Sequence, residues 1–117
     1  MNKELENYYL KQPEPIQSCL LALKSIILSV SKEISQRRMY QIPFFYYRDK
    51  KIAFLWVNRK RTLFGIVTDK SILEFPEGTR RKDSYESIAI DPNEDIPVED
   101  IVGMLRRQMN LYDQPIV

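Results

Sequence analysis

Apolar positions in the first part of the chain recur with helical spacing. Residues 3–12 place Leu5, Tyr8 and Tyr9 on one side of a short helix. We expect that helix to end at Gln12, because a proline disfavours the helical conformation in the residue before it. A longer amphipathic helix of about five turns is predicted from Pro15, whose fixed φ suits a first turn. Its apolar positions, spaced by three or four, are Ile16, Cys19, Leu20, Leu23, Ile26, Ile27, Val30 and Ile34.

After residue 40 the apolar period changes to two, which is typical of strands. Residues 44–47 and 52–57 flank the polar turn 48–51, and the turn 58–61 leads into residues 62–67. These segments predict a three-stranded antiparallel meander. Gly65 inside the third strand indicates a bulge or a close backbone approach.

The later segments alternate between weak and clear patterns. Residues 71–75 fit either a helical turn or a short edge segment, whereas residues 85–90 alternate well enough for a fourth strand. A last helix is predicted to begin at Pro97. Its apolar face comprises Val98, Ile101, Val102, Leu105 and Met109. The chain of 117 residues is therefore expected to form one α+β domain over residues 1–117.

The predicted sheet is apolar on both faces. Phe44 and Tyr46 share one face and Phe45 and Tyr47 the other, because side chains alternate along a strand. The same rule places Ile52, Phe54 and Trp56 opposite Ala53, Leu55 and Val57, and Phe64 and Ile66 opposite Leu63, Gly65 and Val67. An antiparallel sheet with one hydrated face should alternate apolar and polar residues. Helices, a second copy of the chain or a ligand must therefore cover part of this surface.

Composition removes several kinds of chemistry. The chain has no histidine and one cysteine, which excludes an internal disulfide and disfavours nucleophile pairs with histidine and zinc-type metal sites. Cys19 lies on the apolar stripe of the long helix, where we interpret it as a buried thiol. The start of the sequence lacks a signal-like region, and no apolar run reaches the ~20 residues of a membrane helix. We therefore expect a cytoplasmic protein without a membrane partner.

Charge is distributed unevenly along the chain. Residues 37–82 contain 12 Lys and Arg against 4 Asp and Glu, whereas the remaining residues carry an excess of acids, so that the net charge is only +2. Such asymmetry can indicate an anionic partner. We interpret it first as soluble turns between apolar strands, because the basic residues fall mainly in turns.

The order of the elements resembles the YdhG-like family, a set of small bacterial domains of largely unknown function. The resemblance rests on a long helix, the motif Tyr40-Gln41-Ile42-Pro43-Phe44-Phe45, a meander with Ala53-Phe54 in mid-strand, and the helix entry Asp95-Ile96-Pro97. It implies a two-layer α+β sandwich. We expect an antiparallel sheet of about four to five strands with a β-meander core, packed by two N-terminal helices and one C-terminal helix.

One branch of that family is described as a frataxin-like iron chaperone. Iron delivery of that kind should use clustered carboxylates, because hard cations take oxygen ligands. The acids of the early helices, Glu4, Glu6, Glu14 and Glu33, are interleaved with lysines and are interpreted as a solvated face. We assign no metal and no cofactor and keep iron binding as an alternative.

The leading hypothesis is a non-enzymatic domain that binds a small organic or anionic ligand, or a protein partner, on the aromatic sheet face. The candidate binding residues are Arg37, Arg38, Tyr40, Phe44, Tyr46, Phe54 and Trp56, with an arginine as the polar anchor. The competing interpretation is that these aromatic residues simply form core. Homodimerisation through the uncovered face is compatible with either.

Two other functions remain as alternatives. Arg59-Lys60-Arg61 and Arg80-Arg81-Lys82 are candidates for phosphate contacts, and aromatic strands can stack bases. Nucleic-acid binding is nevertheless disfavoured, because successive turns of a meander lie at opposite ends and cannot form one patch. An enzyme would need a Glu, Tyr or Lys base, and Asp69 and Glu74 beside Lys70 are better explained as a polar turn. We therefore assign no catalytic residue.

Overall fold

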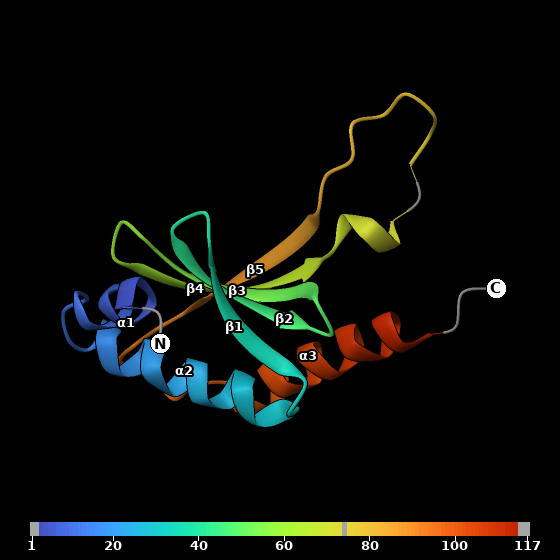
Figure 1. Ribbon diagram of the computed structural model, residues 1–117. Helices are drawn as coiled ribbons and strands as arrows, with labels where there is room; N and C mark the ends of the chain where they lie inside the picture. Colours follow the sequence, from blue (N-terminus) through green and yellow to red (C-terminus); the bar gives the residue numbers. More distant parts are fainter. Residues whose placement is uncertain (1–2, 74, 115–117) are drawn as a thin grey trace.

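The protein is described by a computed structural model that covers residues 3–73 and 75–114. It has two layers, a five-stranded antiparallel sheet in the order β1-β2-β3-β4-β5 and three α-helices packed on one of its faces (Figure 1). The elements are α1 (Lys3–Leu10), α2 (Ile16–Val30), β1 (Ile34–Met39), β2 (Ile42–Tyr47), β3 (Lys50–Asn58), β4 (Arg61–Thr68), the 3-10 helix η1 (Lys70–Ile72), β5 (Ser84–Ile90) and α3 (Val98–Asp113). The predicted α+β sandwich is confirmed.

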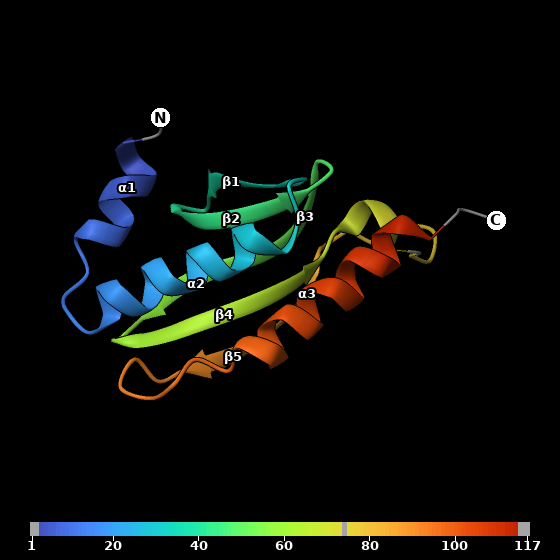
Figure 2. The same cartoon turned by 90° about the horizontal axis from the view of Figure 1, so that it is seen from below.

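The helices cover a single face of the sheet. Seen from below, α2 and α3 both lie in front of the strands (Figure 2). Buried side chains from these helices, among them Leu20, Leu23, Ile27, Ile101 and Leu105, meet the sheet in one large core. The second sheet face carries a smaller buried cluster of Phe44, Tyr46, Phe54 and Val67. The sheet is thus apolar on both faces, as predicted, but only one face receives helices.

The long N-terminal helix is shorter than the sequence pattern predicted. It ends at Val30, where Ser31 is extended with φ −156° and ψ 145°, and Ile34 begins the edge strand β1 instead of continuing the helix. Ile34 packs in the same core from the strand as it would from a helix, so its apolar character alone could not tell the two apart. The prediction was wrong for this reason. β1 was not predicted; it forms one edge of the sheet, and Pro43 lies in the neighbouring strand β2.

Tight hairpins connect β1 to β2, β2 to β3 and β3 to β4. Each turn has two central residues in the left-handed region, Tyr40 and Gln41, Arg48 and Asp49, and Arg59 and Lys60, with φ between 49° and 68°. Two consecutive positive φ values are the signature of a type I′ turn, whose twist matches that of the flanking strands. Four-residue turns were predicted between β2, β3 and β4, but the turns are shorter, so the strands are longer than predicted.

A β-bulge changes the predicted faces of β3. Phe45 pairs with Ala53 and Tyr46 pairs with Lys51, so that Ile52 is an extra residue. Ile52 consequently packs in the helix-side core with Ala53 and Leu55, not with Phe54 as strict alternation predicted. The alternation resumes at Phe54, which lies on the uncovered face.

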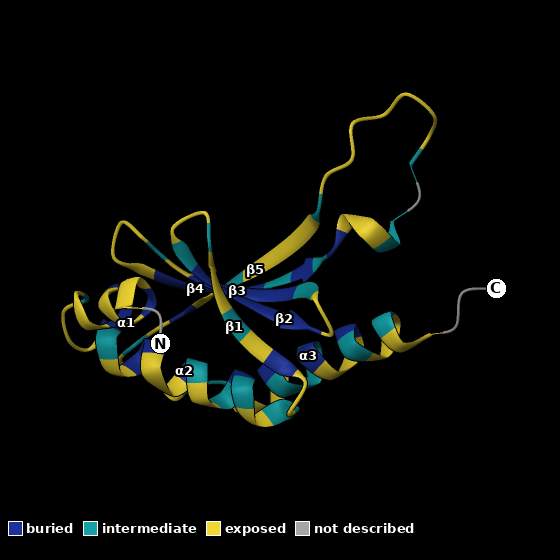
Figure 3. Cartoon of the chain, viewed as in Figure 1, coloured by how far each residue is buried: buried dark blue, intermediate teal, exposed yellow. Residues whose placement is uncertain are grey.

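Burial differs sharply between the centre and one edge of the sheet. β2, β3 and β4 are mostly buried, whereas β5 and residues 76–82 before it are exposed (Figure 3). In the described part of the chain, no helix has the length and apolar character needed to cross a membrane.

Candidate binding groove on the open sheet face

Phe54 forms the floor of the open face because the residue beside it has no side chain. Phe54 pairs with Gly65 across β3 and β4, and its ring lies flat over that glycine. A Cβ atom at Gly65 would come within 2.2 Å of the ring, far closer than any van der Waals contact. The sequence predicted a bulge or a close backbone approach at Gly65; the structure instead shows regular pairing there with an aromatic ring laid across the sheet.

A row of aromatic rings crosses the sheet through Phe54. Its ring centroid lies 5.5 Å from that of Phe44 on one side and 5.9 Å from that of Tyr85 on the other. Tyr40 continues the row, with its centroid 5.8 Å from that of Phe44. Because Tyr40 sits in the β1–β2 turn and Tyr85 on β5, four aromatic side chains span nearly the full width of the sheet.

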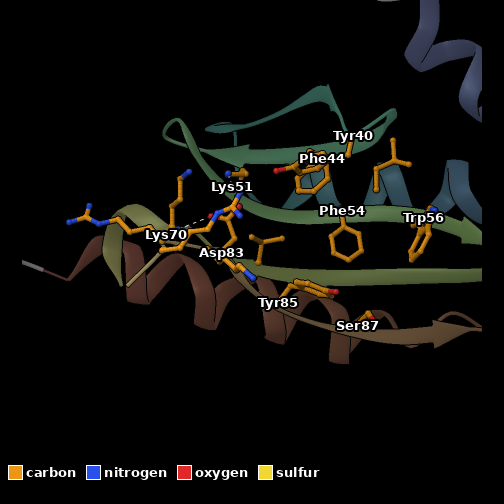
Figure 4. A pocket seen from close by; sticks show the side chains of 14 residues that line it. Tyr40, Phe44, Lys51, Phe54, Trp56, Lys70, Asp83, Tyr85 and Ser87 are labelled. Atoms are coloured by element: carbon orange, nitrogen blue, oxygen red, sulfur yellow. Dashed lines mark hydrogen bonds and ion pairs between the residues drawn. The ribbon is translucent and has the colours of Figure 1, made fainter. Parts of the chain in front are cut away.

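The rings line a groove of about 720 Å³ with two different ends (Figure 4). Trp56 stands at one end and Lys70 near the other, with Phe54 between them. Phe44 and Phe54 are almost fully buried, whereas Tyr40, Trp56 and Tyr85 are 75%, 40% and 67% exposed. The buried rings form a rigid floor, and the exposed rings present faces that a ligand can contact.

The other end of the groove is strongly cationic. Five basic residues and one acid contribute to its lining: Lys51, Lys70, Arg80, Arg81, Lys82 and Asp83. The lining therefore carries a net charge of +4 in a protein whose whole sequence carries +2. An anionic group is attracted to this end, and the apolar floor beneath it reduces screening by water.

Asp83 attaches the basic segment to the sheet. Its carboxylate accepts hydrogen bonds from Lys51 Nζ at 2.7 Å and from the Lys70 N–H at 2.8 Å. The Lys51 and Asp83 side chains are only 12% and 18% exposed. Desolvation lowers the pKa of Lys51, but the hydrogen bond and negative charge of Asp83 outweigh it, so that the pKa is raised and the ammonium stays charged. This ion pair positions Arg80–Lys82 beside the aromatic floor.

A second set of hydrogen bonds supports this end of the groove from beneath. Asp69 accepts hydrogen bonds from the backbone N–H groups of Lys51 and Ser71 at 3.0 and 2.9 Å. Burial raises the pKa of Asp69, but these N–H donors outweigh it and lower the pKa overall. The hydroxyl of Tyr112 on α3 accepts from the Asp69 N–H and contacts the carbonyls of Lys51 and Val67. The last turns of α3 thus fix the strand ends that carry the cations.

Four of the seven predicted site residues, Tyr40, Phe44, Phe54 and Trp56, line the groove. Tyr46 lies on the same face but contributes to the buried cluster beside it, with its hydroxyl 3.4 Å from Met39 Sδ.

The two arginines predicted as polar anchors do not line the groove. Arg37 stacks its guanidinium 4.5 Å from the Tyr46 ring centroid and pairs with Asp49 at 2.8 Å. Arg38 pairs with Glu4 of α1 at 3.0 Å, on the helix-covered side. Arg37 lies on the open face opposite Phe44 but is held by Tyr46 and Asp49. Arg38, its neighbour on the strand, points to the other face.

The cations that do line the groove come from segments that sequence reasoning treated separately. Arg80-Arg81-Lys82 was noticed as a basic cluster but was not connected with the aromatic strands. The connection depends on the contact between Lys51 and Asp83, which are 32 positions apart in the chain. Tyr85 was predicted to lie on a strand. Tyr85 and Ser87, two residues apart, share one face of that strand, and this was the one signal that could have assigned Tyr85 to the open face.

Among the described residues, no three cysteine, aspartate or glutamate side chains gather into a group that could hold a metal ion. Glu74, which the enzyme alternative invoked with Asp69, lies outside the described residues. Asp69 itself is 8% exposed and engaged by backbone N–H groups, as expected for a polar turn. Comparison of the chain with family models, curated proteins and solved structures gave no match.

Proposed function

We propose that the protein is a non-enzymatic binding module that holds a planar organic anion in the open-face groove. The observation that carries this proposal is the continuity of an aromatic floor with a cationic end on a sheet face that no helix of the described residues covers. A ring stacks on Trp56 or Tyr85, and a carboxylate, sulfonate or phosphate on the same molecule reaches Lys70 or Arg80. Apolar walls with a few converging polar groups are typical of small-ligand sites.

The carboxylates near the groove favour binding over catalysis. Asp83 is engaged by Lys51 and by the Lys70 N–H, and Asp69 is engaged by two backbone N–H groups. A general base must reach a substrate proton directly or through one water. Both carboxylates instead stabilise the wall of the groove.

Trp56 provides the test, because it is the only tryptophan in the chain and lines the groove. Titration with naphthalene-2-sulfonate should change its fluorescence in a saturable way, whereas neutral naphthalene and inorganic sulfate should bind more weakly. Replacing Arg80, Arg81 and Lys82 with glutamine should weaken binding of the sulfonate.

The matched control replaces Arg59, Lys60 and Arg61 with glutamine, which removes the same charge from the β3–β4 turn outside the groove lining. Equal losses in both triple variants would show that overall charge, not the groove, attracts the anion. A titration without any saturable change would contradict the proposal.

We also propose that the chain is a YdhG-like domain. The helix–helix–meander–helix order and the position of the Tyr40–Phe45 motif at the first hairpin support this assignment. Solved structures of several YdhG-like domains would test it by superposition. A different strand order in those domains would contradict it.

A further inference from the structure

The groove offers more than one ring face to a ligand. Tyr40 in the β1–β2 turn, Trp56 on β3 and Tyr85 on β5 are all at least 40% exposed and come from three different parts of the sheet. Phe44 and Phe54 hold them apart, since each exposed tyrosine packs edge-on against one of these buried rings. A single small ring can occupy only one of these positions, so the platform suits a ligand that carries several rings.

The charge of the groove suits a ligand that carries several negative charges. Lys51 is neutralised by Asp83, which leaves Lys70, Arg80, Arg81 and Lys82 as the remaining cations of the lining. Three of these are consecutive and lie in the loop that leads from η1 into β5, the strand of Tyr85 (Figure 1). Cations therefore follow the chain toward the rings and are not confined to one point.

We infer that the groove binds single-stranded nucleic acid, an inference that rests on the proposed function of the same site. Unpaired bases stack on exposed aromatic side chains, and phosphates contact a neighbouring basic wall, which is the general design of single-strand binding surfaces. A duplex is a poorer fit, because its bases are already stacked on one another. Basic turns at opposite ends of the meander do not contribute to this site. The cluster that does contribute is brought in by the Lys51–Asp83 contact.

The test is fluorescence anisotropy of fluorescein-labelled ten-residue oligouridylate and oligothymidylate over a range of salt concentrations. Binding should be tighter for each single strand than for a duplex of equal length and tighter than for uridine monophosphate. Each phosphate neutralised on a single strand contributes about −0.7 to the slope of log K against log salt concentration. The variant Arg80→Gln/Arg81→Gln/Lys82→Gln should lower the magnitude of this slope by about 2, which corresponds to three lost contacts.

Matched variants separate the groove from general charge. Arg59→Gln/Lys60→Gln/Arg61→Gln removes the same charge elsewhere and should leave the slope nearly unchanged. Tyr85→Ala and Trp56→Ala should each weaken binding roughly 5- to 150-fold if they stack a base. Leu10→Ala, which removes an apolar side chain that is 60% exposed on α1, should have no effect. Circular dichroism should confirm that each variant is folded. If Trp56→Ala does not fold, Tyr85→Ala still tests the proposal, because Tyr85 lies on an exposed edge strand.

The outcomes distinguish the two proposals. If naphthalene-2-sulfonate binds at the groove but the oligonucleotides bind no tighter than uridine monophosphate, the nucleic-acid inference is overturned and the proposed function stands. Oligonucleotide binding that both triple variants weaken equally would also overturn the inference. If neither kind of ligand changes the fluorescence of Trp56 or the anisotropy, both proposals fail.

Discussion

Gly65 determines where the central ring of the groove can lie. Because a Cβ atom there would overlap the Phe54 ring at 2.2 Å, Gly65→Ala must push the ring off the sheet. We expect a loss of about 1–3 kcal/mol in the free energy of unfolding, as for other overpacked sites, together with weaker ligand binding. Urea denaturation followed by circular dichroism measures the stability.

Gly103→Ala is the matched control for Gly65. Gly103 lies within α3, and the nearest atom to an added Cβ is Arg107 Nη1 at an ordinary 3.7 Å. Alanine there should stabilise the protein by up to about 1 kcal/mol, because glycine is the poorer helix former. Equal effects of the two substitutions would contradict the role assigned to Gly65.

Asp69 should make the stability of the protein dependent on acid pH. Its pKa is lower in the folded protein than in the unfolded chain, so that the unfolded chain takes up the proton first as the pH falls. The stabilisation from the carboxylate is present above about pH 4 and is lost below it. Urea titrations at several pH values should show the advantage of the wild type over Asp69→Asn shrinking as the pH falls below about 4. A constant difference would exclude this explanation.

At the scale of elements, the ion pair of Asp83 should hold the basic segment against β3. Asp83→Asn leaves the largely buried Lys51 ammonium without its partner, and we expect it to lower the free energy of unfolding by about 1–3 kcal/mol. Trypsin should also cleave the variant faster after residues 80–82, because the segment is less tightly attached.

The control for Asp83 is Asp49→Asn, which makes the same charge change at an exposed pair. Asp49 is 86% exposed beside Arg37, so that its loss should change stability by no more than about 0.5 kcal/mol. If the two variants behave alike, the Lys51–Asp83 contact does not attach the segment.

The elements that could be predicted are those in which apolar side chains recur with a regular period. α2, β3, β4, β5 and α3 each carry apolar residues with a clear period, and each was found, although α2 was predicted one turn too long. β1 could not be predicted, because between Ile34 and Met39 it is Ser-Gln-Arg-Arg, a polar edge strand without apolar alternation. Its omission also misplaced Arg38, which points to the helix-covered face.

The candidate site was only half predictable for a related reason. Its aromatic rings lie on periodic strands, so alternation places Phe54 and Trp56 on one face of their strand, and the hairpin register sets Phe44 beside Phe54. Residues 75–83 have no such period, and their position depends on tertiary contacts of Asp83. Sequence patterns report which side chains share a surface of one element, but they do not report which distant segment packs beside it.

At the scale of the whole molecule, tyrosine hydroxyls join the helical layer to the sheet. Tyr8 accepts the N–H of Val57 at 2.9 Å, on the part of β3 that extends beyond its pairing with β2, and Tyr9 donates to Gln36 of β1. Tyr47 of β2 donates to Asp113 at the end of α3 at 2.8 Å. Burial raises the pKa of Tyr8, Tyr9 and Tyr47 above the ordinary value. The hydrogen bonds that Tyr9 and Tyr47 donate between the two layers require neutral phenols.

This arrangement predicts that the domain loses stability at alkaline pH. Because Tyr9 ionises at a higher pH in the folded protein than in the unfolded chain, its stabilising effect is complete below about pH 10 and is lost as the pH rises further. Tyr9→Phe should cost about 1 kcal/mol at neutral pH through its lost hydrogen bond, yet lose stability less steeply than the wild type above about pH 10. Urea titrations from pH 7 to 11 measure both slopes. Parallel slopes for Tyr9→Phe and the wild type would show that Tyr9 ionises alike in the folded and unfolded chains.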